Sequence, residues 1–450
     1  MSLYEVKKTP GDTAWFRHDR FGMFIHFGLY ALPARHEWVK SRECTPEDAY
    51  QRYFDHFDPD LFDAREWARQ AKAAGMKYAV LTTKHHEGFC LFDSQYTDYK
   101  ITNTPFGRDL VKEYVEAFRA EGLKVGFYYS LIDWHHPQFP IDVLHPRRCD
   151  ADAEQQDKGR DMRRYAQYMR DQVTELLSNY GKIDILWMDF SYDKVGYPTD
   201  WKPWMQHDGG KGKEEWEAEA LIATARRLQP HLIINNRSQI DQDLWTPEQY
   251  QPTVWPTDKE GNKVTFEACQ TFSGSWGYFR DEMSWKTPKM LIDMLVNTVS
   301  VGGNLIMNVG PTGRGNFDYR ANEALEVYSE WMRLNSRSIY GCTQAEEGIK
   351  APNGTVLTQS DDGKRLYIHL QTYPFCRIEV EGLCGRVAYA QFLQDASEIA
   401  FSETLRIDSG GDVTEYGGKV FFSLPPVAPH GISPVIEVFL KPEQDKGGQQ

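Results

Sequence analysis

Long apolar runs and basic clusters are both missing from this chain of 450 residues. No apolar stretch approaches the roughly 18 to 20 residues that a membrane-spanning helix requires, so we expect no membrane span. The formal net charge is −14, from 51 Lys and Arg against 65 Asp and Glu. This acidic balance argues against nucleic acid and anionic membranes as partners.

Cysteine is also scarce, with seven residues at wide, irregular spacing and no C-x-x-C pair. The odd number and the spacing argue against a disulfide framework and a cysteine zinc site, so we expect reduced thiols. The first ten residues, MSLYEVKKTP, lack the apolar core of a secretory signal. We therefore expect a cytoplasmic protein, with a secreted or periplasmic origin as the alternative if a leader has been removed.

The overall composition is that of a folded protein. Hydrophobic residues make up 41% of the chain and charged residues 26%, which argues against extensive disorder. The length predicts two or three domains, or one large barrel with an added domain. The sequence does not indicate an oligomeric state.

Short apolar runs alternate with helix-like stretches between residues 20 and 335. We expect strands at 21–28, 77–84, 124–131, 184–190, 231–237 and 304–309, with a further strand near 264–271. The expected helices are at 63–74, 110–120, 160–179, 213–228, 288–300 and 321–333. Strands that are apolar on both faces and alternate with helices favour a (β/α)8-like barrel. The alternative, a doubly wound open sheet, usually carries a glycine-rich turn after its first strand, and this sequence does not.

The pattern changes after residue 340. Runs with period two at 355–359, 365–370, 377–380, 387–393, 420–423 and 435–440 are separated by Gly, Pro and Asp. They predict an antiparallel β-sandwich. We therefore divide the chain into a barrel at 1–340, a C-terminal β-sandwich at 341–442 and a polar tail at 443–450. A supporting role for the sandwich is favoured over a role as a carbohydrate-binding module.

Polar and ionisable residues lie at the carboxyl ends of five consecutive expected strands. They are His26, the pair His85 and His86, Tyr128, Asp189 and Arg237. In a β/α barrel the carboxyl ends of the strands form the binding mouth, so we expect these side chains to converge there.

Metal and serine-nucleophile chemistries fit these residues poorly. The first strand ends in His-Phe-Gly rather than His-x-His. The adjacent side chains of His85 and His86 diverge on a regular strand unless the strand bulges, so we predict no catalytic metal. No nucleophile elbow is present either.

Carboxylate chemistry remains. Asp189 follows an apolar strand, and cleavage of a glycosidic bond needs a second carboxylate. Glu248 and Glu267 are available for that role in the irregular segment downstream. A simple ion pair between Asp189 and Arg237 is the structural alternative.

Eight ordered sequence blocks lie between residues 21 and 315. They are FGMFIHFGLYALPA at 21–34, HEW at 36–38, LTTKHHEGFCLF at 81–92, TDYKITNTPFGRDLV at 97–111, GFYYSLIDWH at 126–135, ILWMDF at 185–190, SGSWGY at 273–278 and VSVGGNLIMNVGPTGRG at 299–315. Together they resemble the α-L-fucosidases, family 29 of the glycoside hydrolases. The resemblance implies a barrel followed by a β-sandwich, and retaining hydrolysis of a fucosylated oligosaccharide or glycoconjugate through a fucosyl-enzyme. It also implies that no metal and no cofactor take part.

The resemblance implies roles for individual residues. Asp189 is the expected nucleophile, Trp38 an aromatic neighbour of the sugar, and Trp276 an aromatic residue near the methyl group of the sugar. The expected hydroxyl-binding residues are His26, Glu37, His85, His86, Tyr128 and Arg237.

The general acid is assigned on a weaker match. Glu248 lies in Trp-Thr-Pro-Glu, which resembles the acid-bearing T-P-E loop of the family, and is our first choice. Glu267 lies in Phe-Glu-Ala-Cys and is the second choice. The alternative role for Glu267 is that of a buried partner of a histidine or an arginine.

Two other functions stay open on the same scaffold. One is hydrolysis of a related sugar such as α-L-galactose, which differs only at C6. The other is a catalytically weak sugar-binding protein, because Phe190 and Phe266 stand where the family often has glycine and tryptophan. The sequence does not indicate the linkage or the leaving group.

Overall fold

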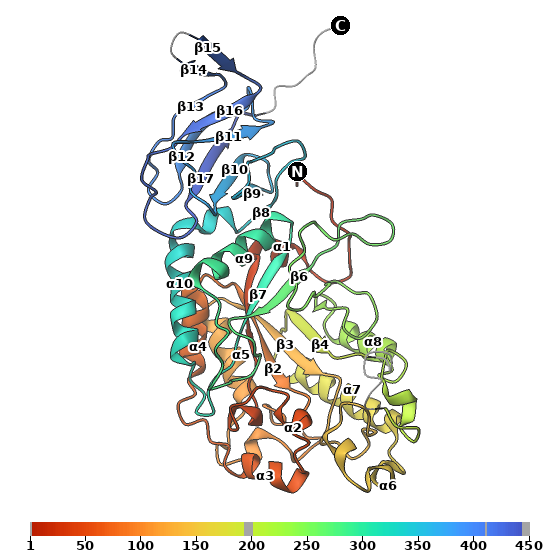
Figure 1. Cartoon of the computed structure of the whole chain (residues 1–450). Helices are drawn as coiled ribbons and strands as arrows, with labels where there is room; N and C mark the ends of the chain where they lie inside the picture. The colour runs from red at the N-terminus through yellow and green to blue at the C-terminus, as the bar shows by residue number, and fades with distance from the viewer. Residues whose placement is uncertain (1, 193–200, 410–411, 443–450) are drawn as a thin grey trace.

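The computed structural model describes residues 2–192, 201–409 and 412–442. A (β/α)8-like barrel is followed by a C-terminal β-sandwich, which confirms the predicted fold class (Figure 1). The predicted polar tail at 443–450 lies outside the described residues. No helix in the described part of the chain is long and apolar enough to cross a membrane.

A sheet of seven parallel strands forms the barrel within the described residues, in the order β5-β4-β3-β2-β1-β7-β6. The strands are β1 Phe21–Ile25, β2 Tyr78–Lys84, β3 Lys124–Ser130, β4 Ile185–Asp189, β5 Ile233–Ile234, β6 Glu267–Thr271 and β7 Asn304–Val309. Strands β1 to β5 pair in chain order, and β7 pairs with the other edge of β1. This circular order is that of a barrel, whereas a doubly wound sheet reverses its strand order at a switch point.

Residues 244–248 close the barrel between β5 and β6. Single parallel bridges join Leu244 to Asn235 and Glu248 to Cys269. The further strand predicted in this part of the chain is confirmed as β6, and the irregular segment before it takes the eighth position of the barrel. Because this segment closes the barrel, Glu248 lies at the same end of the barrel as the carboxyl ends of the regular strands.

Helices cover the outside of the sheet (Figure 1). The longer ones are α4 Ala64–Ala73, α5 Leu110–Ala120, α7 Met162–Asn179, α8 Ala218–Leu228, α9 Pro288–Ser300 and α10 Tyr319–Asn335. Most begin at a residue whose side chain accepts from first-turn N–H groups, namely Asp63, Asp109, Asp161, Thr287 and Asp318. The sequence did not indicate the short helices α1 Ala14–Asp19, α2 Val39–Arg42, α3 Glu47–Asp55 and α6 Ala153–Asp157, which are too short for a long apolar repeat.

Apolar side chains fill the inside of the barrel. One buried cluster includes Phe24, Val80, Tyr128, Ile185, Trp187, Ile233, Leu244 and Ile306. Strands β1, β2, β4, β6 and β7 are buried at every position. Their residues face this interior and the surrounding helices in alternation, which explains why the strands are apolar on both faces. The interior forms a dry floor beneath the polar strand ends.

Two antiparallel sheets form the C-terminal β-sandwich. The larger has the order β12-β17-β10-β9-β8, with β8 Cys342–Gln344, β9 Thr355–Ser360, β10 Arg365–Leu370, β12 Val387–Phe392 and β17 Val435–Leu440. The smaller contains β11 Arg377–Glu381, β13 Phe401–Ser402 and β16 Lys419–Ser423. A separate hairpin joins β14 Leu405–Ser409 to β15 Asp412–Tyr416. The sequence missed β8, β13, β14 and β15, which are short or largely exposed.

The sandwich is attached to the barrel by hydrogen bonds to its backbone. Trp331 Nε1 in α10 donates to the Ile432 carbonyl at 2.9 Å, and Arg20 Nε donates to the Cys342 carbonyl at 2.8 Å. Figure 1 shows the sandwich at the end of the molecule opposite to α2 and α3, which follow the carboxyl end of β1. None of its described residues lines the pocket at the barrel mouth, so its position favours a supporting role.

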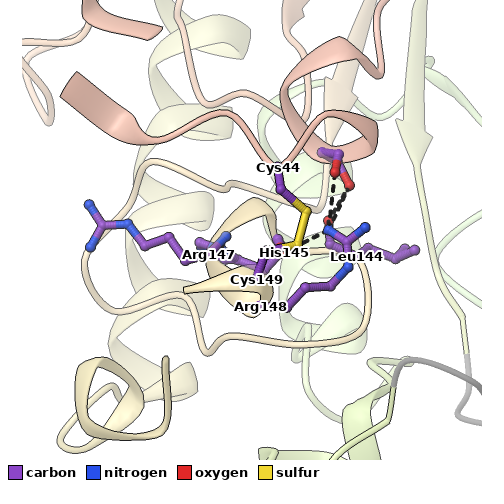
Figure 2. The surroundings of a disulfide bond; sticks show 7 residues. Cys44, Leu144, His145, Arg147, Arg148 and Cys149 are labelled. Atoms are coloured by element: carbon purple, nitrogen blue, oxygen red, sulfur yellow. Dashed lines mark hydrogen bonds between the residues drawn. A yellow bond between two sulfur atoms is a disulfide. The ribbon is translucent and has the colours of Figure 1, made fainter. Parts of the chain in front are cut away.

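One expectation about cysteine is wrong. Cys44 and Cys149 form a disulfide bond across 105 residues of sequence (Figure 2). It joins the end of α2 to the long loop after β3, where the Ser41 hydroxyl also donates to the Leu144 carbonyl at 2.6 Å. Sequence spacing could not reveal this pair because tertiary contacts between the two loops bring the thiols together. The other cysteines are free thiols, of which Cys384 is exposed, Cys376 is partly exposed and the rest are buried.

We expect the unfolded, unreduced protein to react with five equivalents of a thiol reagent, and the reduced protein with seven, because two of the seven cysteines are bonded. Cys149→Ser should lower the thermal midpoint, since a disulfide closing a loop of this length contributes about 4 kcal/mol. Cys384→Ser is the control and should leave the midpoint unchanged. Seven reactive thiols before reduction would contradict the bond.

Candidate active site

The polar strand ends converge on one pocket at the carboxyl end of the barrel. Its lining consists of Phe24, His26, Glu37, Trp38, His85, His86, Tyr128, Trp187, Asp189, Phe190, Glu248 and Trp276. Every site residue named from the sequence is in this set except Arg237, which contacts three of its members, and Glu267, which lies deeper. The segments that supply these side chains are far apart in the sequence, and the circular strand order brings them together.

Arg237 holds the two candidate catalytic carboxylates together. Its Nη1 atom donates to Asp189 Oδ1 at 3.2 Å and to Glu248 Oε2 at 2.7 Å. The two bonded oxygens are therefore within about 6 Å of each other, which suits the separation of about 5–5.5 Å in retaining glycosidases. Thr246 fixes the guanidinium by accepting from Nε at 2.9 Å and from Nη2 at 3.0 Å.

Asp189 is a buried carboxylate whose pKa is shifted in opposite directions by its surroundings. Burial and the nearby Glu248 carboxylate raise its pKa to about 7, although Arg237 and the Tyr128 phenol act in the other direction. The Tyr128 hydroxyl donates to Asp189 Oδ2 at 2.9 Å. The neighbouring Tyr129 points away, as the strand alternation predicts, and donates to Gln172 in α7. Asp189 thus ionises less readily than an aspartate in water.

His85 and His86 lie side by side in the pocket, with ring centroids 4.0 Å apart. The pairing of β2 with β3 shifts register between Thr82 and Lys84, just before the two histidines, so the strand is not regular there. Lys84 instead forms a buried ion pair with Asp133 at 3.0 Å. Burial lowers the pKa of both imidazoles well below the usual value, so both rings are neutral hydrogen-bonding groups.

His26 follows β1, the strand next to β2, and its ring centroid lies 5.7 Å from that of His85. Its Nδ1 lies 2.6 Å from Asn308 Oδ1, and its ring packs against Trp276 and Phe24 with centroid distances of 5.2 and 4.5 Å. Burial lowers the pKa of His26 to about 3, so this imidazole is also neutral. Trp276 therefore belongs to the apolar wall of the pocket rather than to the general core.

Glu37 and Trp38 enter the pocket from the turn before α2. Glu37 is buried and accepts from the Gly277 amide at 2.8 Å, which ties this turn to the segment that carries Trp276. Burial raises the pKa of Glu37. The Trp38 ring lies 4.8 Å from that of His86.

Glu267 occupies a different environment from Glu248. It is fully buried at the start of β6, where it accepts from the Tyr78 hydroxyl at 2.6 Å and from Trp187 Nε1 at 3.2 Å. Burial raises its pKa to about 7. Its partners are a phenol and an indole, rather than the histidine or arginine considered from the sequence. Trp187 lines the pocket above it, so Glu267 lies beneath the floor.

Three aromatic residues of the pocket were not assigned to the site from the sequence. Phe24 and Trp187 have the same inward alternation as the polar strand ends, which was a usable signal. Phe190 follows Asp189 with φ 152°, a region that favours glycine, and its ring lies 5.4 Å from that of Trp38. A glycine would adopt this backbone conformation without strain.

Comparison with known proteins identifies the family. A family model described as alpha-L-fucosidase matches residues 4–337. The chain belongs to the α-L-fucosidase family. It is a glycosidase, and the predicted relationship is confirmed.

Solved structures and curated relatives agree with this assignment. The chain is similar to α-L-fucosidase isoenzyme 1 of Paenibacillus thiaminolyticus, with 43% identity and a TM-score of 0.86 over 96% of this chain and 99% of that one. It is similar to a Bacteroides thetaiotaomicron α-L-fucosidase solved as a trapped covalent intermediate, with 28% identity and a TM-score of 0.79 over 97% and 98% of the chains. Human plasma α-L-fucosidase is 29% identical over 365 residues, which is 73% of this chain and 69% of the human protein.

We expect Arg237→Gln to move the acid limb of the pH profile of kcat/KM to higher pH. The prediction takes the ionised Asp189 as the active form, so that activity falls as pH drops through its pKa, which is about 7 in the intact site. Removing the guanidinium charge, which lowers that pKa, raises it further. The profile is measured with an aryl α-L-fucoside.

Tyr128→Phe is the matched control, because it removes one hydrogen bond to Asp189 but no charge. Its acid limb should move in the same direction by a smaller amount. An acid limb that stays in place or moves to lower pH in Arg237→Gln would contradict this description of Asp189.

Proposed function

We propose that this protein is an exo-acting, retaining α-L-fucosidase that releases terminal α-L-fucose through a covalent fucosyl-enzyme. Asp189 is the nucleophile and Glu248 the general acid and base. The observation that carries the proposal is the pair of carboxylates held on one nitrogen of Arg237 at the barrel mouth. The relative trapped as a covalent intermediate supports the retaining course.

The first step transfers the sugar to the enzyme. The ionised Asp189 carboxylate attacks C1 of the bound fucoside while Glu248 protonates the departing glycosidic oxygen. The C1–O bond breaks as the bond to Asp189 forms. The positive charge that develops on the sugar ring favours the ionised form of Asp189 during this step.

The second step returns the enzyme to its starting state. Glu248, now ionised, takes a proton from water, and the resulting oxygen nucleophile attacks C1 and displaces Asp189. Glu248 suits this role because its side chain is 40% exposed, whereas that of Asp189 is 12% exposed. Water and a leaving group can reach Glu248 without opening the floor of the pocket.

The remaining pocket residues suit a deoxy sugar. Neutral imidazoles of His26, His85 and His86 provide hydrogen-bonding atoms without charge, which fits hydroxyl groups. Trp276 and Phe24 provide an apolar wall, which fits the C6 methyl group that distinguishes fucose from galactose.

We expect cleavage of 4-nitrophenyl α-L-fucoside, cleavage of the α-L-galactoside reduced by roughly 10- to 100-fold, and no cleavage of the β-D-fucoside. An apolar pocket discriminates only moderately against one added hydroxyl, whereas the anomeric configuration decides which face Asp189 attacks. Release of 4-nitrophenol measures all three. A faster galactoside would change the assigned substrate, and fucose binding without any release would indicate a sugar-binding protein.

Asp189→Gly should reduce turnover of the aryl fucoside by roughly 10³-fold or more, because the nucleophile is removed. Azide should restore part of the activity by occupying the vacated space, and the product should be a glycosyl azide. Asp281→Gly, at a 64% exposed side chain outside the pocket, is the control and should need no rescue. Normal activity of Asp189→Gly would refute the assignment.

Glu248→Ala should harm natural fucosides far more than substrates with a good leaving group such as 2,4-dinitrophenolate. A general acid is needed only where the leaving oxygen requires a proton. The alkaline limb of the pH profile should flatten, and azide should accelerate turnover of the activated substrate.

Glu267→Ala is the matched comparison. Because the side-chain hydrogen bonds of Glu267 among the described residues are those with Tyr78 and Trp187, its loss should weaken both classes of substrate alike. The reverse pattern, with leaving-group dependence in Glu267→Ala and not in Glu248→Ala, would transfer the acid role to Glu267.

A further inference from the structure

Asn308 at the end of β7 connects a pocket histidine to the aromatic wall. Its side-chain oxygen lies 2.6 Å from His26 Nδ1, and its side-chain nitrogen donates to the Trp276 carbonyl at 2.6 Å. Asn308 is 2% exposed and His26 is 4% exposed, so water does not compete for these contacts. The hydrogen bonds between Asn308, His26 and the Trp276 carbonyl are therefore determined by the protein alone.

These contacts determine which nitrogen of His26 carries the proton. A backbone carbonyl can only accept, so the amide nitrogen of Asn308 must face Trp276 and the amide oxygen must face His26. An amide oxygen also can only accept, so His26 Nδ1 carries the hydrogen. Because burial keeps this imidazole neutral, with its pKa near 3, Nε2 has no hydrogen and presents a lone pair.

Ser130 leads to the same result at His86 by a separate path. The Ser130 hydroxyl donates its single hydrogen to the Ile132 carbonyl at 2.7 Å. Its oxygen, 2.7 Å from His86 Nδ1, must then accept from that nitrogen. His86 Nε2 is left as an acceptor, 4.0 Å from Asp189 Oδ2, with which it cannot form a hydrogen bond.

We propose that Asn308 and Ser130 are positioning residues that fix His26 and His86 as hydrogen-bond acceptors for substrate hydroxyl groups. Both imidazoles then require a hydroxyl that donates. A sugar position that carries hydrogen, fluorine or a methyl ether in place of the hydroxyl loses the contact. The identity of the ligand rests on the proposed function, whereas the positions of the protons rest on protein contacts alone.

The proton positions are tested by neutron diffraction from crystals of the deuterium-exchanged, unmutated protein, since hydrogens are not located by X-rays at ordinary resolution. We expect deuterium on Nδ1 of both His26 and His86, and none on Nε2. Deuterium on Nε2 of either ring would overturn the proposal for that residue. This result does not depend on activity: a protein that fails to cleave fucosides but shows these deuterons would refute the proposed function and leave the tautomers in place.

The consequence for recognition is tested with Asn308→Ala and the 2-, 3- and 4-deoxy derivatives of an aryl α-L-fucoside. Asn308→Ala removes the hydrogen bond that orients His26, which should lower kcat/KM for the parent fucoside by roughly 10- to 100-fold. One of the deoxy derivatives lacks the hydroxyl that binds His26. For this derivative the mutation should lower kcat/KM at least several-fold less, because the contact between the hydroxyl and His26 is already missing. Equal losses for all four substrates would show a merely structural role and overturn the proposal.

Two further variants complete the design. Ser130→Ala should show the same selective pattern with a different deoxy derivative, because His86 reads another hydroxyl; the absence of any selective pattern would refute the role of Ser130. Asn316→Ala alters an exposed asparagine in the loop that follows β7 and should leave all four values unchanged. A uniform loss in Asn316→Ala would show that the loop, rather than the Asn308 contact, controls the site.

Discussion

The guanidinium of Arg237 is the group on which the rest of the site depends. The carboxylates of Asp189 and Glu248 repel each other at this distance. Burial also increases the free-energy cost of ionising Asp189. One cation bonded to both makes the arrangement stable. Its own position depends on Thr246 and on the face of Trp187, 4.8 Å below it. The strands β4 and β5 and the closing segment 244–248 must therefore be in register for the chemistry to exist.

The apolar interior of the barrel strengthens the electrostatic interactions between these charged groups. The cluster around Phe24 and Trp187 excludes water from beneath the pocket, so the electrostatic interactions above it are poorly screened. The same floor keeps the histidines neutral and raises the pKa of Asp189. Packing of ordinary core residues thus determines protonation states at the mouth. The sandwich, attached at the other end, leaves that mouth open to a substrate.

The sequence predicted the parts that local pattern controls. Buried strands and capped helices have strong periodicity, and polar residues at strand ends identified His26, Asp189 and Arg237 before any fold was known. Strand alternation separated Tyr128 from Tyr129 correctly. The role of each residue in catalysis came only from family resemblance, because spacing alone does not distinguish a nucleophile from a buried ion pair.

The remaining features depend on contacts between distant segments. The register shift near the end of β2 accompanies a buried ion pair between Lys84 and Asp133, and the disulfide between Cys44 and Cys149 joins two loops that are distant in the sequence. Neither leaves a periodic signal. The closing segment 244–248 was equally invisible, since it pairs through isolated bridges rather than a ladder. In each case a tertiary constraint overrides what the local sequence favours.

Under the proposed mechanism, in which Asp189 is the nucleophile and Glu248 the acid and base, the environments of the two carboxylates suit both halves of a retaining reaction. The nucleophile must leave the sugar again, so it benefits from a dry site in which its free charge is only moderately stable. The acid and base must exchange protons with a leaving group and then with water, so it benefits from exposure. Asp189 is enclosed by Tyr128 and Arg237, and Glu248 stands at the rim on a segment without regular structure. Irregular closure of the barrel is therefore the feature that gives the second carboxylate access to solvent while Arg237 keeps it close to the first.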